Sequence, residues 1–182
     1  MAKIKGKFIT MACFLLESKP EVKEEAKQRI KEMTGKEWNQ LEPEGWFDVS
    51  VLEAVFKSVE KHHGSIMGWA WIKTMGKRVY PTIDETVGLP KDLKTPLDWL
   101  RWEGNSFLDD HQGDDVVPRK FLVTDPGHVV VEAVSPGYNC AFIDGVYEGI
   151  LDICKIKNYK VVQTRCLRKG DPVCEYDITW KE

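Results

Sequence analysis

The sequence predicts an α+β fold, in which an N-terminal helical layer packs on a mainly antiparallel sheet that carries one amphipathic helix. Apolar residues recur at helical spacing through the first part of the chain, and from about residue 115 short alternating runs separated by turn signals replace that pattern. The 182 residues suit a single domain over 1–182, with a helical part at about 1–112 and a sheet-plus-helix part at about 115–182.

The composition is typical of an ordinary globular protein, with 42% hydrophobic and 30% charged residues. The net charge is −3 and the basic residues are scattered, which argues against a nucleic-acid-binding surface. The apolar run at 8–16 is too short to span a membrane and lacks a cleavage signal, so the sequence predicts a cytoplasmic protein. The odd number of cysteines fits a reducing compartment: Cys13, Cys140, Cys154, Cys166 and Cys174.

Helices are expected at four places in the first part. One begins at Pro20 and ends at Gly35. A second begins near Ser50, in a capping box with Glu53, and ends at Gly64. A third covers 65–75, and a loop then runs to about residue 94. The fourth is capped by Thr95 with Pro96 in its first turn, and Gly104 is a candidate break within it.

The later part predicts strands over 119–125 and 128–134, joined by an Asp-Pro-Gly turn. An amphipathic helix follows over 139–155, in which Gly145 and Gly149 lie one turn apart and permit close approach of a neighbouring backbone. A hairpin of 159–167 and 173–180 ends the chain. Together these elements predict a sheet with one helix packed on it.

The terminal hairpin brings two cysteines near a third. Alternation puts Cys174 on one face of its strand, and Val162, Thr164 and Cys166 share a face of the partner strand, so Cys166 and Cys174 are expected to be cross-strand neighbours. Cys140 stands at the start of the amphipathic helix, with Asn139 as the cap. The spacing of the cysteines alone leaves three interpretations open: a zinc site of three thiolates, a disulfide, or buried reduced thiols.

The stretch GYNCAFIDGVYEGILDIC…VVQTRCLRKGDPVCEYDITW resembles the 4-vinyl reductase domain family over roughly residues 115–182. This family includes sensor domains that recognise phenols and other aromatic hydrocarbons. It is related in fold to haem-based nitric-oxide sensors and to subunits of the TRAPP vesicle-tethering complex. The resemblance therefore implies a 4-vinyl-reductase/haem-NO-binding-like fold and a ligand-binding role.

The resemblance also implies a metal site. Aromatic-sensing members hold zinc with the pattern Cys-x22-Glu-x2-Cys-x7-Cys, and the same register here gives Cys140, Gln163, Cys166 and Cys174. A neutral amide is a poorer zinc ligand than a carboxylate, so Gln163 weakens the site unless water or Glu175 completes it. If zinc is bound, its expected role is structural, fastening the helix to the hairpin. If it is not, the cysteines are part of the core.

A ligand pocket between the helical layer and the sheet is a further implication of the resemblance. Its candidate lining residues are Trp99, Trp102, Phe107, His111, Phe142 and Val146. In aromatic sensors a histidine from the region of His111 bonds the ligand hydroxyl, and in related haem sensors a histidine from a comparable region binds iron. The sequence disfavours haem without excluding it, because no CxxCH occurs and only one axial histidine is a candidate.

The function predicted from these features is a sensor-like module that binds a small hydrophobic or aromatic molecule without catalysis. It is expected to homodimerise and to signal through a partner protein. One alternative is a cysteine-dependent hydrolase, because TRCLRKGDPVCEYDITW also resembles the end of proteins related to L-2-amino-thiazoline-4-carboxylate hydrolase, with His111 or His128 as base. Another is a tetrapyrrole-related protein, although no GxGxxG nicotinamide motif supports vinyl reduction.

Overall fold

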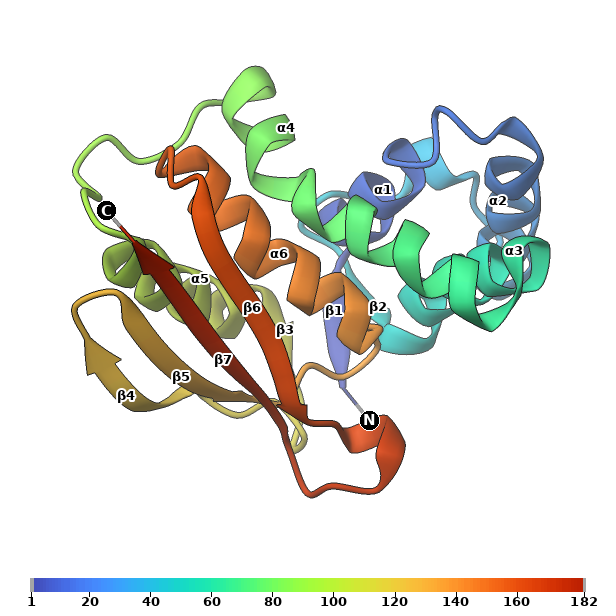
Figure 1. Ribbon diagram of the computed structural model, residues 1–182. Coiled ribbons are helices and arrows are strands. Elements are labelled where there is room, and N and C mark those ends of the chain that lie inside the picture. Colours follow the sequence, from blue (N-terminus) through green and yellow to red (C-terminus); the bar gives the residue numbers. More distant parts are fainter. Residues whose placement is uncertain (1, 182) are drawn as a thin grey trace.

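Helices of the first half stand beside a four-stranded antiparallel sheet in the computed structural model, which describes residues 2–181 (Figure 1). The predicted α+β class is therefore confirmed. The elements in chain order are β1 (Lys3–Lys5), α1 (Gly6–Phe14), α2 (Pro20–Thr34), the short helix η1 (Trp38–Gln40), β2 (Trp46–Asp48), α3 (Val49–Lys77), α4 (Val79–Thr86), α5 (Pro96–Asp110), β3 (His111–Gln112), β4 (Lys120–Asp125), β5 (His128–Ala133), α6 (Cys140–Ile153), β6 (Asn158–Arg165), the short helix η2 (Leu167–Lys169) and β7 (Cys174–Lys181).

The start of α3 differs from the expected capping box. Asp48 is the cap, and its carboxylate accepts a hydrogen bond from the backbone N–H of Ser50 at 2.9 Å. The helix therefore begins one residue before Ser50, and the predicted pairing of Ser50 with Glu53 is wrong. Helix α2 matches its prediction, because it begins at Pro20 and ends at Gly35 in the left-handed conformation.

Two predicted helices of the first half form one long element. Gly64 has a φ of 72°, so it bends α3 sharply instead of ending it, and the segment 65–75 continues beyond the bend. The segment 76–94, predicted to be a loop, contains the helix α4, which was not predicted from the sequence. Pro81 lies in the first turn of α4, where its missing N–H costs no helical hydrogen bond.

Helix α5 is continuous through Gly104 and is capped as predicted. The hydroxyl of Thr95 accepts from the N–H of Asp98 at 3.2 Å, and the Asp98 carboxylate accepts from the N–H of Thr95 at 3.0 Å. A Cβ at Gly104 would lie 2.8 Å from Cγ of Arg119. The glycine therefore makes room for the side chain of Arg119 and does not break the helix.

A small three-stranded sheet that the sequence did not predict joins both halves of the chain. Its order is β2-β1-β3, and the strands are two or three residues long, too short for an alternation pattern to appear. In this sheet Ile4 of β1 is paired with His111 of β3. The N-terminal segment consequently holds the end of α5 and the ring of His111 in place.

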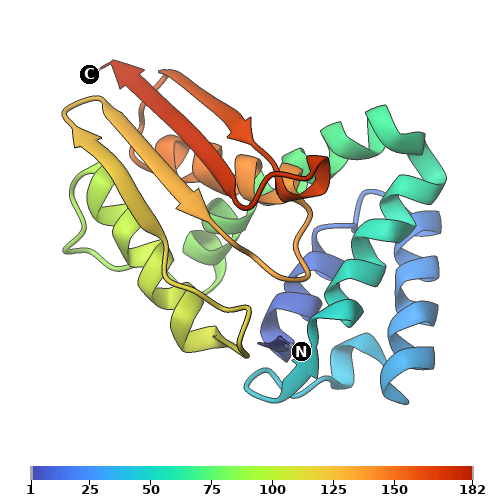
Figure 2. The same ribbon diagram turned by 90° about the horizontal axis from the view of Figure 1, so that it is seen from below.

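The main sheet has the order β4-β5-β7-β6, and α5 and α6 lie on the same face of it (Figure 2). An irregularity between Gln163 and Arg165 shifts the register of β6 against β7. Val161 is buried before this shift and Cys166 is buried after it, whereas Val162 is only half-buried. The simple alternation that grouped Val162 with Cys166 is therefore wrong, although Cys166 still reaches the inner face.

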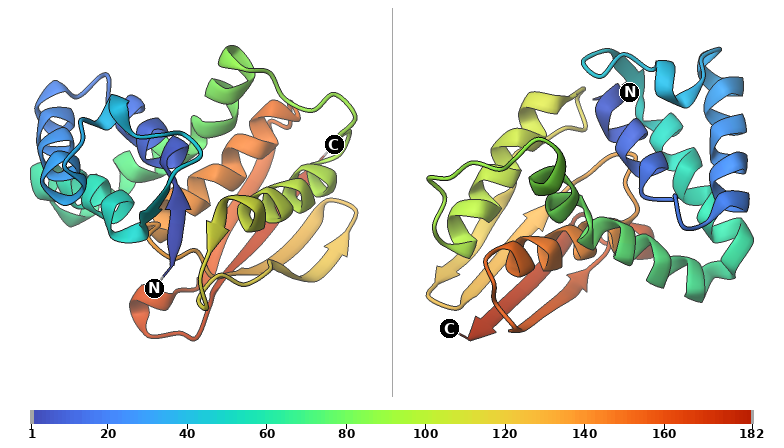
Figure 3. Two further views of the ribbon diagram at one scale, coloured as in Figure 1. Left: turned by 180° about the vertical axis from the view of Figure 1, so that it is seen from behind. Right: turned by 90° about the horizontal axis from the view of Figure 1, so that it is seen from above.

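Helices α3 and α6 lie against each other (Figure 3), and glycines stand at their contact. A Cβ at Gly145 would lie 2.0 Å from the carbonyl oxygen of Lys73, and one at Gly149 would lie 2.5 Å from that of Lys77. A Cβ at Gly76 of α3 would meet the carbonyl oxygen of Phe142 at 2.0 Å. The close approach predicted from Gly145 and Gly149 is confirmed, and it fixes the helical half against the sheet half. Among residues 2–181, no helix has the length and apolar content needed to cross a membrane.

Candidate functional site

A small interior cavity of about 70 Å³ lies between the helical half and the sheet half. Its walls come from α1, α4, α5, β3, α6 and the segments that precede β4 and α6. Most of the surface is apolar or aromatic, and the lining residues are Phe8, Met11, Val79, Tyr80, Glu103, Ser106, Phe107, His111, Arg119, Tyr138, Phe142, Ile143 and Val146. A mainly apolar wall with a few convergent polar groups is typical of a small-molecule site.

His111 is held in one orientation by two hydrogen bonds. Its Nδ1 donates to the carbonyl oxygen of Phe107 at 2.6 Å, which leaves the lone pair on Nε2. The hydroxyl of Tyr138 donates to Nε2 at 3.2 Å. The ring also stacks on Phe107 with centroids 4.0 Å apart and lies 5.3 Å from the ring of Phe8. This pattern fixes the tautomer and turns Nε2 toward a side chain that also lines the cavity.

The imidazole of His111 is neutral near pH 7. Burial lowers its pKa to about 4, because the charged form loses its hydration, and the nearby positive charge of Arg119 acts in the same direction. The side chain is only 4% exposed. A neutral imidazole is the form that binds a metal ion.

A buried ion pair forms another part of the cavity wall. Nη2 of Arg119 donates to the carboxylate of Glu103 at 2.9 Å. Nη1 donates to Ser135 Oγ at 2.8 Å and to the carbonyl oxygen of Val134 at 3.2 Å. The guanidinium also lies 3.9 Å from the centre of the Phe107 ring. Burial lowers the pKa of Arg119, but the pairing with Glu103 outweighs it and raises the pKa overall. The pair therefore neutralises both charges at the wall.

Four of the six predicted ligand-binding residues line the cavity, namely Phe107, His111, Phe142 and Val146. Trp99 and Trp102 do not line it: they pack edge-on against each other and against Tyr80, which separates them from the cavity. Contact of any of these six residues with a ligand stays a prediction. Arg119 was missed, since a basic residue before a strand resembles an ordinary surface residue in the sequence.

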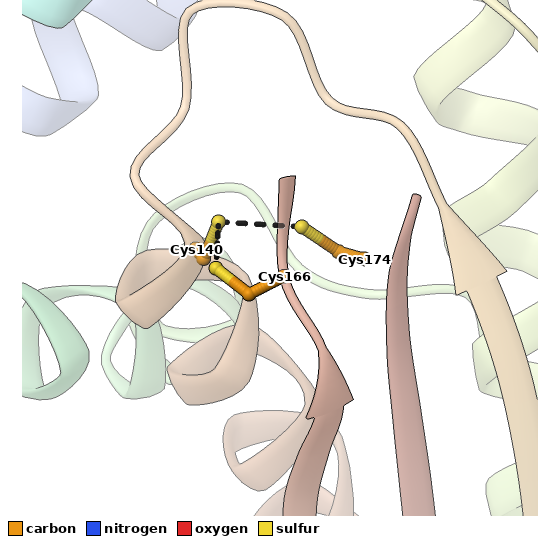
Figure 4. A group of neighbouring side chains, drawn as sticks. All are labelled: Cys140, Cys166 and Cys174. Atoms are coloured by element: carbon orange, nitrogen blue, oxygen red, sulfur yellow. Dashed lines mark hydrogen bonds between the residues drawn. The ribbon is translucent and has the colours of Figure 1, made fainter. Parts of the chain in front are cut away.

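Three cysteines form a second cluster, at the junction of α6 and the terminal hairpin (Figure 4). The sulfurs of Cys140 and Cys174 lie 3.3 Å apart, and those of Cys140 and Cys166 lie 3.6 Å apart. All three side chains are buried, and each is a free thiol in this structure. The predicted meeting of these residues is therefore present, with Asn139 capping α6 by accepting from the N–H of Ala141.

The fourth predicted metal-site residue lies next to the cluster. Gln163 is near enough to Cys140 to act against the rise in the pKa of that thiol, and its amide donates toward the hydroxyl of Tyr176 at 3.4 Å. Glu175, the substitute ligand considered from the sequence, lies on the other side of β7, where it accepts from Thr164 Oγ1 at 2.6 Å. Glu175 therefore does not complete the site in this structure.

The three thiols have different acidities. A hydrogen bond from Cys140 lowers the pKa of Cys174 to about 7, and the N–H of Leu167, 3.5 Å from its sulfur, acts in the same direction. The same interaction with Cys174, together with burial, raises the pKa of Cys140. Burial raises the pKa of Cys166. Cys174 is thus the thiol of the cluster that loses its proton first.

The two histidines proposed as catalytic bases have other partners. His128 lies 3.0 Å from Asp177 on the outer face of the sheet, and His111 bonds Phe107 and Tyr138. The metal-ligating cluster found among residues 2–181 consists of cysteines alone. A cysteine–histidine pair for hydrolysis is consequently not formed by the side chains that the structure describes.

Comparison with known proteins gives fold neighbours only. No family model matches the chain, and no curated protein matches it. The chain is similar to solved H-NOX structures, among them a structure from a study of haem distortion in the H-NOX family (TM-score 0.75, 15% identity, 98% of this chain and 96% of that one). It is also similar to an H-NOX protein of S. oneidensis in the Fe(II)NO ligation state (0.73, 11%, 98% and 100%) and to a point mutant of T. tengcongensis H-NOX (0.71, 16%, 98% and 98%).

These neighbours correct the expectation about cofactors. The sequence disfavoured haem, but the similar structures include one from work on haem distortion and one in an Fe(II)NO ligation state, so that inference is wrong. The donor types match the group, since His111 has a neutral nitrogen flanked by aromatic rings and Arg119 has a guanidinium, but Nε2 of His111 accepts from Tyr138 and Arg119 is paired with Glu103. The cavity is smaller than the roughly 300–1,000 Å³ of usual ligand pockets, so its walls must move apart to admit a macrocycle. Over 98% of its length, the chain has the fold of the H-NOX proteins.

Proposed function

We propose that this chain is a small-molecule sensor module that holds haem between its helical half and its sheet half, with His111 as the axial ligand. The observation that carries the proposal is the geometry of His111. Its Nδ1–H is bound to the carbonyl oxygen of Phe107, so the lone pair lies on Nε2, which accepts from the hydroxyl of Tyr138, and both residues line the cavity. Metal-binding histidines are oriented in this way by a hydrogen bond from the other ring nitrogen.

The residues of the cavity have separate roles in this proposal. His111 would hold the iron through Nε2, the atom to which the Tyr138 hydroxyl donates at present. Phe107, Phe142 and Val146 exclude water, and Arg119 would pair with a haem carboxylate only by giving up its present bond to Glu103. Bound haem supplies an iron centre at which small diatomic molecules bind. The ordering or movement of the segment around Tyr138 then carries the signal to a partner protein.

Haem titration of the full chain tests this proposal. The wild type is expected to bind one haem per chain with a sharp absorption band of histidine-ligated iron. His111→Ala is expected to lose that band, whereas the control His128→Ala, which changes a histidine on the outer sheet face, keeps it. Absence of stoichiometric binding in the wild type, or an unchanged spectrum in His111→Ala, would overturn it.

A small neutral apolar guest is the second candidate, and the size of the cavity favours it. An apolar cavity of about 150 Å³ in another protein takes up benzene or xenon, and this one has about 70 Å³. Its charged groups are neutralised in the Arg119–Glu103 pair, and His111 is uncharged. Xenon-dependent NMR shifts at Ile143 and Val146 would support direct binding, and Val146→Phe, which fills the space, should abolish them. Shifts that persist in Val146→Phe would reject it.

A metal site at the three cysteines and a homodimer are further parts of the proposal. The resemblance to 4-vinyl reductase domains makes the three cysteines a candidate structural zinc site, which Gln163 weakens in place of a charged fourth ligand, and homodimerisation accompanies signalling. Native mass spectrometry tests these parts together, because it reports bound metal and subunit number. A metal-free monomer at micromolar concentration would contradict both.

A further inference from the structure

We propose that the three-cysteine cluster is a binding site for trivalent arsenic of the arsenite class, coordinated by Cys140, Cys166 and Cys174, and that Gln163 sets its preference over zinc. The inference shares the three cysteines with the proposed zinc site, and it does not depend on haem. Three features of the cluster carry it: the number of donors, their spacing and the charge of their surroundings.

The cluster offers three strong donors and a weak fourth. The sulfurs come from the start of α6 and from the two arms of the terminal hairpin, and all lie within 4.8 Å of one another. The adjacent Gln163 is a neutral amide, and Glu175 is bound to Thr164 on the other side of the strand. Structural zinc sites close with four good ligands. Trivalent arsenic completes its bonding with three sulfurs.

The spacing of the sulfurs also favours a three-coordinate centre. Tetrahedral zinc with Zn–S bonds of about 2.3 Å places its sulfurs about 3.8 Å apart. The two sulfur–sulfur distances at Cys140 are 3.3 and 3.6 Å. Shorter edges correspond to narrower S–X–S angles at similar bond length, which is the shape of a three-sided pyramid. The third edge, between the sulfurs of Cys166 and Cys174, lies within 4.8 Å, so a pyramidal centre draws these two sulfurs closer together.

The groups that hydrogen-bond toward the sulfurs are uncharged, and the Asp171 carboxylate, which accepts from the backbone N–H of Cys166 at 2.7 Å, is negative and supplies no counter-charge. The uncharged groups include the Gln163 amide, the Tyr176 hydroxyl and the N–H of Leu167, and the three cysteine side chains are 3–6% exposed. Zinc with three thiolates would leave one net negative charge at this buried position, which is costly without a counter-charge. Arsenic(III) with three thiolates is neutral, so the buried environment favours it.

The binding step balances without an oxidant or reductant. One arsenous acid reacts with three thiols to give the tris-thiolate and three waters. Three As–O bonds and three S–H bonds break, and three As–S bonds and three O–H bonds form. Arsenic stays trivalent throughout. Bridging of α6 to both hairpin arms by one atom is expected to raise the melting temperature of the chain.

Competition between sodium arsenite and zinc on the reduced full chain tests the proposal. Native mass spectrometry should show one arsenic per chain at the loss of three hydrogens, and zinc at equal concentration should not displace it. Cys166→Ser should lose arsenite binding, while Cys154→Ser, which changes a cysteine outside the cluster, should retain it. Circular dichroism of Cys166→Ser shows whether the variant is folded.

The variant Gln163→Glu decides between arsenic and zinc, because it adds a charged fourth donor and leaves the three cysteines unchanged. We expect at least a tenfold gain in zinc affinity and at least a tenfold loss of arsenite competition against zinc. Preferential zinc binding by the wild type would overturn the proposal and support a zinc site. Equal preferences in wild type and Gln163→Glu would remove Gln163 from its assigned role. If Cys166→Ser does not fold, the comparison of wild type with Gln163→Glu still distinguishes an arsenic site from a zinc site.

Discussion

The imidazole of His111 and the hydroxyl of Tyr138 meet at 3.2 Å, which joins the end of α5 to the segment that leads into α6. These two residues are 27 positions apart in the chain and both line the cavity. Tyr138 is followed by Asn139, which caps α6 and donates to Glu60 of α3 at 2.7 Å. A ligand that takes the Nε2 position therefore acts on the link between the two halves.

Tyr138→Phe should destabilise the protein by about 1–2 kcal/mol, because it leaves the buried Nε2 of His111 without its donor. Tyr147→Phe is the matched control. The hydroxyl of Tyr147 is buried and has no hydrogen-bond partner among the residues that the structure describes, so its removal should be neutral or stabilising. Urea unfolding at pH 7 compares the two. An equal loss in both variants would contradict the role assigned to Tyr138.

The stability of the fold should fall as the pH drops from about 6.5 to about 4. Burial lowers the folded-state pKa of His111 to about 4, so between these values the unfolded chain binds a proton that the folded chain does not. The stabilisation is present above the unfolded pKa, and the loss approaches about 3 kcal/mol near pH 4. Besides burial, Arg119 and Lys7 oppose protonation of the ring, whereas the hydrogen bond to the carbonyl of Phe107 and the charge of Asp110 favour it.

Urea unfolding of wild type and His111→Gln across this pH range isolates the contribution of the histidine. The wild type should lose more stability than the variant between pH 6.5 and 4, since glutamine does not titrate. Parallel curves for the two proteins would show that His111 is not the source of the pH dependence.

Gly145→Ala should cost about 3 kcal/mol or more, because its Cβ would lie 2.0 Å from the carbonyl oxygen of Lys73 on the packed backbone of α3. Gly104→Ala is the comparison. Its Cβ would meet the Cγ of Arg119 at 2.8 Å, and a side chain can move where a backbone cannot. Its loss should be less than half as large. Thermal melting measures both, and a larger loss for Gly104→Ala would contradict the close packing of α3 and α6.

Arg119→Met should destabilise the fold by about 3–5 kcal/mol, because it leaves the carboxylate of Glu103 buried without its partner. The double variant Glu103→Leu with Arg119→Met should recover much of that loss, since both charges are gone. As a control, Lys57→Met breaks the exposed pair with Glu53 and should change stability by less than about 1 kcal/mol. A double variant as unstable as the sum of the two single variants would argue against direct coupling.

Much of the fold was predictable because its signals are local. The cap at Thr95, the left-handed end at Gly35 and the glycine approach on α6 each depend on a few neighbouring residues, and the structure contains all three. The meeting of Cys140 with the hairpin cysteines was not a local signal, because it was expected from the resemblance to 4-vinyl reductase domains. The three-stranded sheet was not predictable, because its strands pair across some 40 to 110 positions with only two or three residues each.

The cavity was predicted less completely than the thiol cluster. Phe107 and His111 were named, but the contribution of α1 and the ion pair of Arg119 with Glu103 depend on tertiary packing. Trp99 and Trp102 were expected at the ligand on account of their size and shared helix face, yet they pack against Tyr80. The sequence disfavoured haem because it contains no CxxCH motif. An axial histidine needs no such motif beside it, so this absence was a poor guide.

The measurement that tests the central claim most directly is the amount of haem retained per chain after reconstitution and gel filtration, in wild type and in His111→Ala. The account predicts one haem per wild-type chain, a histidine-ligated absorption spectrum, and loss of that spectrum in the variant while folding is maintained. A wild type that elutes without haem, or a variant whose spectrum equals that of the wild type, would contradict it.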